Sequence, residues 1–401
     1  MIIIHLIWLI FSYLVAIHWS IISIFVVIGI VGSILYKNDV HEDDLYSTDL
    51  TNSKLDKNIE FCIVSKASKE VGGVLFNCID YHARKFSPYK INLIIDENSE
   101  LEKKLEIHVK KYKNVKIYKV SENFKTKAIA KGRAIHYHVV KRAEPNKWYV
   151  FLDDDNLIMD SKFLKEIEYY DKKGYVAANG VLYPRYSGNS ITYVADFIRY
   201  ADDITLFRSM TGLLGRPLNG FHGELMIVKG SVLKEIGFDR ESVTEDFAFA
   251  RELEKRKYKI WQSKTVTSIL CPHTIKDFIK QRNRWYRGIH NDVKEGTTEM
   301  KLVAGIRDLD LTIAIVGSWA VFPLWFFMPI PLEWTLFNLI GSGYYLTVYI
   351  YGSTKLRHKD KYWFLHPFLL PLYSAMETIV PHYKPKDKNF NVIFKDEKLK
   401  S

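Results

Sequence analysis

Hydrophobic and polar positions divide the chain into two apolar regions and a mixed region between them. Residues 1–36 contain no Asp, Glu, Lys or Arg, and residues 311–353 contain one charged residue, Glu333. An uncharged run of that first length is nearly twice the ~20 residues that a membrane-spanning helix needs. It therefore predicts two short transmembrane helices that turn near residues 18–20, with a single tilted helix as the alternative.

The mixed region alternates short apolar runs with amphipathic segments. Buried strands are predicted where β-branched and aromatic residues cluster, at Ile59–Val64, Lys90–Ile95, Val115–Val120 and Trp148–Leu152. Helices are predicted between them, at 71–85, 101–112 and 128–143. This alternation predicts an α/β fold with a mostly parallel sheet that is covered by helices on both faces. Ligands of such sheets bind beyond the carboxyl ends of the strands.

The chain is therefore expected to have six segments. They are an N-terminal transmembrane segment (1–36), a linker (37–58), a large α/β domain (59–275), an amphipathic interfacial helix (276–298), C-terminal transmembrane or re-entrant helices (299–382) and a basic tail (383–401). Within the C-terminal part, helices are expected at 311–331 and 334–351, followed by a segment, 363–380, that prolines interrupt.

The formal net charge of +11 changes the picture only through its distribution. The basic residues form no stripe with interleaved aromatics and no nucleic-acid motif, so we expect no nucleic-acid partner. They gather beside the apolar regions, at Lys355–Lys361 and after Lys384, as in loops that face anionic lipid. The three cysteines have neither paired nor metal-ligand spacing, which indicates a reducing compartment. We predict an integral membrane protein with a cytosolic domain.

An acidic cluster, FLDDDN, ends the fourth predicted strand. In a strand-like geometry Asp153 and Asp155 point the same way and Asp154 faces away. Two carboxylates beside a diphosphate suit Mg²⁺ or Mn²⁺, which take part of their oxygen ligands from protein and part from phosphate. An ordinary Asp- and Asn-rich turn is the alternative.

A second acidic cluster, SVTEDF, precedes a predicted helix. Asp246 at this helix start is a candidate general base, because a carboxylate near a sugar hydroxyl can accept its proton. Ser242 and Glu245 also have the spacing of a capping box, which is the structural alternative. Should Asp246 serve only as a cap, Glu245 is the next candidate base.

The stretch GFHGE lies between these two acidic clusters and precedes the second one. Gly220 and Gly223 flank Phe221 and His222, so backbone could approach a ligand closely and an aromatic ring could stack on a sugar. A turn before the strand-like run ELMIV explains the same glycines.

The basic stretch FIKQRNRWYRG precedes the second apolar region. In a helix Gln281, Arg284 and Trp285 share one face. Arg282, Tyr286 and Arg287 are then expected to meet lipid headgroups. Such an interfacial helix can direct a guanidinium at a diphosphate and an indole at the base of a pocket, and a purely membrane-anchoring helix is the alternative.

These signals occur in an order that resembles the membrane-bound family 2 glycosyltransferases, which are inverting enzymes with a GT-A fold. The order is Asp96 after the second strand, then DDD, TED and QRNRW. Within that family, the stretches ADFIRYADD, PLNGFHGELMIVK and AKGRAIHYH are similar to egghead-type β-1,4-mannosyltransferases and related archaeal enzymes.

The resemblance implies a role for each candidate residue. Asp96 contacts the nucleoside, Lys131 the diphosphate, and Asp153 and Asp155 the nucleotide and metal, while Asp246 is the base. Diphosphate and acceptor sugar are held by Gln281, Arg284 and Trp285, and the acceptor also contacts Phe221, His222 and Gly223.

The implied reaction is transfer of one sugar from a nucleotide sugar, expected to be mannose from GDP-mannose, to a lipid-linked sugar acceptor with formation of a β-glycosidic bond. A UDP-glucose-dependent glucosyltransferase and a processive β-polysaccharide synthase are the alternatives. Single-sugar transfer is favoured, because at most five apolar segments are too few for a secretion channel.

Overall fold

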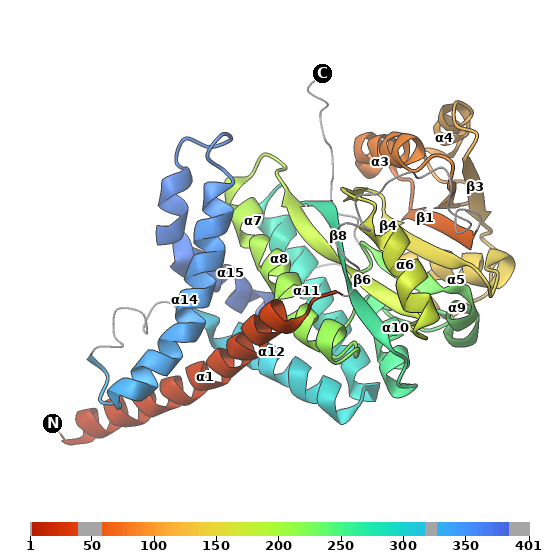
Figure 1. Ribbon diagram of the computed structural model, residues 1–401. Coiled ribbons are helices and arrows are strands. Elements are labelled where there is room, and N and C mark those ends of the chain that lie inside the picture. Colours follow the sequence, from red (N-terminus) through yellow and green to blue (C-terminus); the bar gives the residue numbers. More distant parts are fainter. Residues whose placement is uncertain (1, 39–57, 317–326, 385–401) are drawn as a thin grey trace.

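A single mixed sheet forms the centre of the computed structural model (Figure 1). The structure describes residues 2–38, 58–316 and 327–384, and for residues 309–316 it describes the backbone only. The sheet has eight strands in the order β3-β2-β1-β4-β7-β6-β8-β5. The strands are β1 (Ile59–Ser65), β2 (Lys90–Asp96), β3 (Val115–Val120), β4 (Trp148–Asp153), β5 (Leu157–Ile158), β6 (Ala177–Arg185), β7 (Met226–Lys229) and β8 (Ile260–Leu270).

The four strands expected from the sequence are β1 to β4, and they pair in parallel as predicted. Beyond β4 the sheet is mixed. Strand β7 runs antiparallel to both β4 and β6, and β5 runs antiparallel to β8, while β6 and β8 are parallel. The expected α/β architecture is therefore confirmed, with a parallel half and a mixed half.

Helices cover both faces of the sheet, because alternate strand residues are apolar on both sides. Phe61 of β1 packs in one core with residues of α3 (Gly72–Lys85), α4 (Glu102–Val109) and α6 (Lys162–Lys172). Cys62, its neighbour, packs in a second core with α5 (Ala130–Arg142), α9 (Gly230–Ile236) and α10 (Glu245–Lys255). This alternation is the period-two geometry of a strand buried on both faces.

The N-terminal apolar region is one continuous helix, α1 (Ile2–Leu35), so the expected hairpin is wrong and the single-helix alternative holds. No Gly, Pro or Asn occurs at residues 18–20 to turn the chain. Instead the Ser20 hydroxyl donates to the Ala16 carbonyl one turn back, at 2.8 Å. Among the described residues, α1 is the one helix long and apolar enough to cross a membrane.

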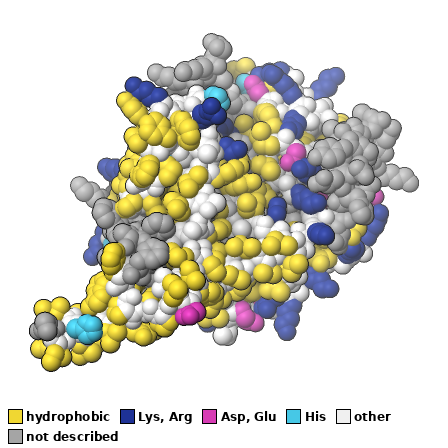
Figure 2. Space-filling model, turned by 60° about the vertical axis from the view of Figure 1, so that its left-hand side comes forward, with side chains coloured by type: hydrophobic (Ala, Val, Ile, Leu, Met, Phe, Trp, Pro, Cys, Tyr) yellow, Lys and Arg dark blue, Asp and Glu magenta, His cyan; other side chains and the backbone are white. Residues whose placement is uncertain are grey.

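Much of the α1 surface is apolar and exposed. Ile3, Ile7 and Leu14 retain 73%, 62% and 62% of their accessible surface. Figure 2 shows the projecting end of this helix covered by hydrophobic side chains, with most Lys and Arg side chains away from it. An apolar surface of this extent is typical of contact with a membrane or a partner rather than with water.

Apart from the short turn η2 (Lys69–Val71) that follows β1, the remaining elements form a helical layer beside the mixed half of the sheet. They are α7 (Ser190–Ala195), α8 (Phe197–Ile204), η3 (Arg208–Leu213), α11 (Ile275–Asp292), η4 (Val293–Glu295), α12 (Thr298–Val316), α14 (Leu332–Thr354), η7 (Trp363–Leu369), α15 (Leu370–Ile379) and η8 (Val380–His382).

The C-terminal elements agree only in part with the expected transmembrane helices. The helix expected at 334–351 lies within α14, but no described C-terminal helix has the apolarity of a membrane span. The 363–380 segment is interrupted as predicted, by a 3-10 turn that contains Pro367 and then a short helix with Pro371 in its first turn. Residues 317–326 of the other expected helix, most of the linker and nearly all of the basic tail lie outside the described residues.

Helix α1 packs closely against both the C-terminal helices and the α/β domain. Asn338 of α14 accepts from Ser20 at 2.9 Å and donates to the Ala16 carbonyl at 3.0 Å. Nearer its end, α1 meets η3 through Gly32. Just beyond the helix, the Tyr36 hydroxyl donates to the Gln262 carbonyl in β8 at 2.8 Å. The helix is therefore fastened to the sheet and does not stand apart as a tether.

We expect Gly32→Ala to destabilise the fold by about 1–3 kcal/mol through overpacking. A Cβ at Gly32 would lie 2.5 Å from the Ser209 backbone nitrogen and 2.7 Å from its Cα, which no side-chain rotation can relieve. The matched control is Gly343→Ala in α14, where a Cβ meets nothing within 4 Å and should add up to ~1 kcal/mol of helix stability. Thermal unfolding of both variants in one detergent measures the difference, and equal melting temperatures would contradict the close contact.

Candidate active site

Charged side chains from four segments converge at the carboxyl ends of β1, β2 and β4. At their centre is Lys131, in the first turn of α5, with 16% of its side chain exposed. Its ammonium forms an ion pair with Asp153 at the end of β4 and donates to the Gly223 carbonyl at 2.8 Å. The Glu245 carboxylate lies 3.9 Å away. Lys131 thus joins the two acidic clusters that the sequence singled out.

Asp246 occupies the first turn of α10. One carboxylate oxygen accepts from the Gly223 amide at 2.7 Å, and the other from the Phe247 amide at 2.8 Å. The capping-box alternative is wrong in this geometry, because α10 has no side-chain cap from Thr244, and the Ser242 hydroxyl donates to Asp292 on α11 at 2.6 Å. The Asp246 carboxylate is therefore held from both sides and faces a pocket.

Crowded carboxylates change the acidity of this site. Burial, and then the neighbouring Asp246 charge, raise the pKa of Glu245 to about 7, although the Lys131 ammonium opposes the rise. Burial and the Glu224 carboxylate raise the pKa of Asp246. Burial alone would lower the pKa of Lys131, but Asp153 and Glu245 outweigh it and the pKa is raised, so Lys131 stays charged.

The GFHGE loop brings backbone against these groups, as its glycines suggested. A Cβ at Gly223 would lie 2.7 Å from the Lys131 ammonium and 3.2 Å from an Asp246 oxygen, so a larger residue would displace the Lys131 side chain. Gly220 has φ +89, a conformation that favours glycine. Phe221 and His222 both line the pocket that Asp246 faces.

The DDD cluster lies partly in a turn, which differs from the expected strand-like alternation. Strand β4 ends at Asp153, and Asp154 accepts from the Ser65 hydroxyl at 2.7 Å. Asp155 is buried, and its backbone carbonyl accepts from Arg185 at 2.7 Å. Within the described ranges no group of three His, Cys, Asp or Glu side chains could hold a metal ion. Asp153 and Asp155 fit an oxygen-preferring divalent ion that takes its other ligands from a diphosphate and water.

Asp96 lies at the end of β2, on the far side of the same edge. Its carboxylate pairs with Arg133 of α5 at 2.9 Å, and burial raises its pKa although Arg133 opposes the rise. Its side chain remains 45% exposed. It can therefore accept a hydrogen bond from a ligand that lies along this edge.

The helix α11 carries the QRNRW residues, and two guanidinium groups lie close to the Trp285 ring. Arg199 and Arg282 stand 4.6 and 4.8 Å from its ring. The expectation that Arg282 meets lipid headgroups is wrong, because it faces inward and pairs with buried Asp196 at 2.6 Å. Arg287 is exposed as expected.

The other two candidate residues of the QRNRW stretch, Gln281 and Arg284, have different surroundings. Arg284 donates to the Val243 carbonyl beside the TED turn, at 3.3 Å. The side-chain oxygen of Gln281 is buried and accepts no hydrogen bond from the described residues. Such an oxygen is suited to accept one from a ligand.

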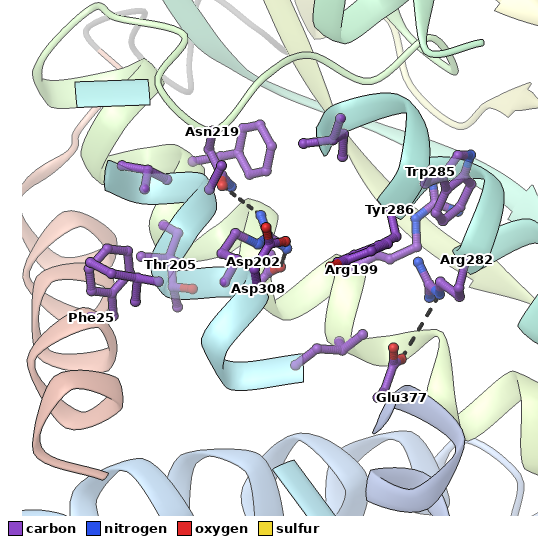
Figure 3. A pocket seen from close by; sticks show the side chains of 18 of the residues that line it. Phe25, Arg199, Asp202, Thr205, Asn219, Arg282, Trp285, Tyr286, Asp308 and Glu377 are labelled. Carbon is purple, nitrogen blue, oxygen red and sulfur yellow. Dashed lines mark hydrogen bonds and ion pairs between the residues drawn. The ribbon is translucent and has the colours of Figure 1, made fainter. Parts of the chain in front are cut away.

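A cavity of about 320 Å³ begins at Asp246 and extends between α11, α12, α14 and α1 (Figure 3). At its polar end, His222 pairs with fully buried Asp203 at 2.6 Å, and Glu224 pairs with Arg199. Burial lowers the pKa of His222, but the Asp203 charge more than offsets this and the pKa is raised. Trp285 lines the same cavity, so the expected acceptor residues lie together around Asp246.

Several residues of this cavity were not among the expected site residues. Arg199 and Asp202 lie in ADFIRYADD, where two acids and a base spaced along one helix were an available signal. The contribution of α1, including Trp19 and Phe25, had no local signal, because the pairing of α1 with distant helices is a tertiary property.

The sequence was compared with known families, proteins and structures. Residues 148–376 match the model of glycosyl transferase family group 2. The chain belongs to this family. The β-1,4-mannosyltransferase bre-3 of Caenorhabditis elegans is 26% identical over 213 residues, which cover 50% of this chain and 45% of that protein. The β-1,4-mannosyltransferase egh of Drosophila melanogaster is 26% identical over 230 residues, 54% of this chain and 49% of that protein.

The expected family resemblance is thus confirmed, and this glycosyltransferase spans about half the length of the curated relatives it matches. Among solved structures, the mannosyltransferase PcManGT from Pyrobaculum calidifontis in complex with GDP-Man and Mn²⁺ has a TM-score of 0.49 and 12% identity, over 91% of this chain and 99% of that one.

We expect Lys131→Met to destabilise this glycosyltransferase in a pH-dependent way, by about 3 kcal/mol where the carboxylates are charged. An unfolded Glu titrates near ~4.3, whereas folded Glu245 has a pKa of about 7, so its charge costs stability as pH rises through that window. Removal of the cation raises the folded pKa further. The deficit in melting temperature should therefore be small at pH 5 and large at pH 8. A deficit that does not change with pH would contradict the central role of Lys131.

Proposed function

We propose that this protein transfers mannose from GDP-mannose to a lipid-linked sugar acceptor, with inversion at the anomeric carbon and formation of a β-glycosidic bond. The observation that carries this proposal is the position of Asp246. Its carboxylate lies between the Lys131–Asp153 edge, where a donor would bind, and the cavity beside Trp285, where an acceptor would bind.

The reaction is a single displacement. Asp246 accepts the proton of an acceptor hydroxyl as that oxygen attacks the anomeric carbon of the donor sugar. The bond between the anomeric carbon and the phosphate oxygen breaks, and its electron pair leaves with the nucleoside diphosphate. Attack from the face opposite the diphosphate converts an α-linked sugar nucleotide into a β-glycoside.

The donor would lie along the carboxyl edge of the sheet. Asp96 accepts a hydrogen bond from the nucleoside, and the cationic side chains of Lys131 and Arg284 face the diphosphate. Asp153 and Asp155 would hold Mg²⁺ or Mn²⁺, which when bound neutralises charge on the leaving diphosphate. Lys131 must then exchange part of its pairing with Asp153 for contact with phosphate.

The acceptor would lie in the cavity. Trp285 lines this cavity, with its ring fixed by contacts with two arginines, and would contact the sugar, while His222 offers a hydrogen-bonding group fixed by Asp203. The exposed apolar surface of α1 supports attachment to a membrane. We place the catalytic domain on the cytosolic side, because basic residues gather at Lys355–Lys361.

The sugar and the number of sugars transferred are argued from the relatives and from the size of the cavity. Mannose is favoured by the activity named for the 26% identical relatives. Polymer synthesis has one observation in its favour, a 150-residue match at 31% identity to a poly-β-1,6-N-acetyl-D-glucosamine synthase of Staphylococcus epidermidis. We favour single transfer, because a cavity of about 320 Å³ is at the lower end of the ~300–1,000 Å³ typical of small-molecule sites.

The donor is tested by incubating membranes that contain the protein with radiolabelled GDP-mannose, UDP-glucose or UDP-N-acetylglucosamine, with Mn²⁺ or after chelation. We expect GDP-mannose alone to label extractable lipid by one sugar per acceptor, and chelation to abolish the labelling. Labelling by UDP-glucose instead would overturn the donor assignment. Full labelling after thorough chelation would overturn the metal assignment.

We expect Asp246→Asn to reduce transfer by about 10²–10⁴-fold, the usual contribution of a positioned base. Asn keeps an oxygen that can accept from the Gly223 amide, so melting temperature should change little. In the native protein, transfer should fall as pH drops through an Asp246 pKa that burial raises above the usual ~3.9. Glu245→Gln is the matched variant and should keep most activity. A fully active Asp246→Asn protein with an inactive Glu245→Gln protein would reverse the two roles.

A further inference from the structure

The acceptor cavity continues past its polar end into an apolar part whose wall is α1. Trp19, Ile22 and Val26 of α1 line it and are 4–6% exposed. Val303 and Ala304 of α12 line the same cavity. We infer that this apolar part binds the first segment of the acceptor's hydrocarbon chain. This inference rests on the proposed sugar transfer to a lipid-linked acceptor and assigns the chain a site inside the protein.

The two sides of α1 differ in a way that supports this assignment. Ile10 and Leu14 face outward and keep 53% and 62% of their surface exposed, whereas Trp19 and Ile22 turn inward. The helix is held in place by the Gly32 contact with Ser209 and by the Asn338 hydrogen bonds. A chain in the cavity is therefore separated from the outward face of α1 and contacts protein on its inner side.

The charges at the polar end specify the kind of head that such a chain carries. Each arginine that lines the cavity within the described residues is already paired with a carboxylate, Arg199 with Glu224, Arg282 with Asp196 and Arg307 with Asp202. A phosphate head would bring a negative charge next to Asp246 and Glu224, where the arginines of the cavity are already engaged by carboxylates. Paired guanidinium and carboxylate groups suit the hydroxyls of a neutral sugar.

Arg307 links the chain-binding wall to the sugar-binding loop. It extends from α12 and donates to Asn219 at 2.5 Å and to Asp202 at 2.9 Å. Asn219 lies in the same loop as Phe221 and His222. The occupant is thus an amphiphile with a neutral glycosyl head at Asp246 and an alkyl chain between α1 and α12, and not a phosphate-headed lipid or a polysaccharide strand.

Photolabelling tests this site without any donor. The probe is dodecyl β-glucoside with a diazirine at the end of the chain, added to the full-length protein in lipid nanodiscs. We expect labelled peptides from the inward side of α1 and from α12. Excess dodecyl β-glucoside should prevent the labelling, and dodecyl phosphate should not. Because no sugar nucleotide is present, a wrong donor assignment cannot produce or remove this result.

Ala304→Trp fills the cavity. Its matched control is Leu302→Trp, on another face of α12, where the side chain is 64% exposed. We expect Ala304→Trp to lower labelling about tenfold and the control to leave it unchanged. Ile22→Thr, which adds a hydroxyl without added bulk, should also lower labelling if Ala304→Trp fails to fold. Labelling confined to the outward face of α1, or labelling that neither cavity variant changes, would overturn the inference.

A transfer assay with the sugar nucleotide that proves active separates chain from head. Ala304→Trp should raise the KM for dodecyl β-glucoside about tenfold and leave the KM for methyl β-glucoside unchanged. Equal effects on both acceptors would contradict a site for the chain. Competition by soluble oligosaccharides, with none by the alkyl chain, would favour a polysaccharide strand as the occupant. Competition by dodecyl phosphate would overturn the neutral head.

Discussion

The ammonium of Lys131 is the interaction on which the arrangement of the site depends. Among the described residues it is the one cation in contact with both Asp153 and Glu245, and it also donates a hydrogen bond to the Gly223 carbonyl. Strand β4, the GFHGE loop and helix α10 meet at this sheet edge. One positive charge holds them there, since the carboxylates alone would repel each other. Burial and then the neighbouring carboxylates raise the pKa of Glu245 and of Asp246, although Lys131 opposes both rises. A nucleotide that brings its own metal ion and phosphates replaces one balanced set of charges with another.

The second constraint is that the long apolar helix α1 and the α/β domain form one packed structure. Helix α1 shares a core with α14 and supports the cavity floor, while its end is hydrogen-bonded to β8. The cavity therefore has one wall from the α/β domain and another from the apolar helix α1. The two sides of α1 differ, because its outward side chains are exposed and its inward ones line the cavity.

The sequence predicted the parallel half of the sheet and the segments of the site, because those signals are local. Runs such as WYVFL read as strands on their own, and the order of acidic and QRNRW motifs identified the family. Strands β6 and β8 escaped prediction since AANGVLYPR contains Gly and Pro and IWQSKTVTSIL alternates with polar residues, and only tertiary packing buries both. The inward position of Arg282 depended on Asp196, 86 residues away, and the continuity of α1 overrode the expectation drawn from its length alone.

The length of α1 has a geometric consequence. At 1.5 Å per residue its 34 residues span about 51 Å, against about 30 Å for the hydrocarbon layer. In an upright helix that enters this layer at Ile2, Trp19 stands about 26 Å along the axis and Val26 about 36 Å. The stretch that lines the cavity then straddles the boundary between hydrocarbon and headgroups. For a helix inserted in this way, bilayer thickness would set the depth of the cavity relative to the headgroups.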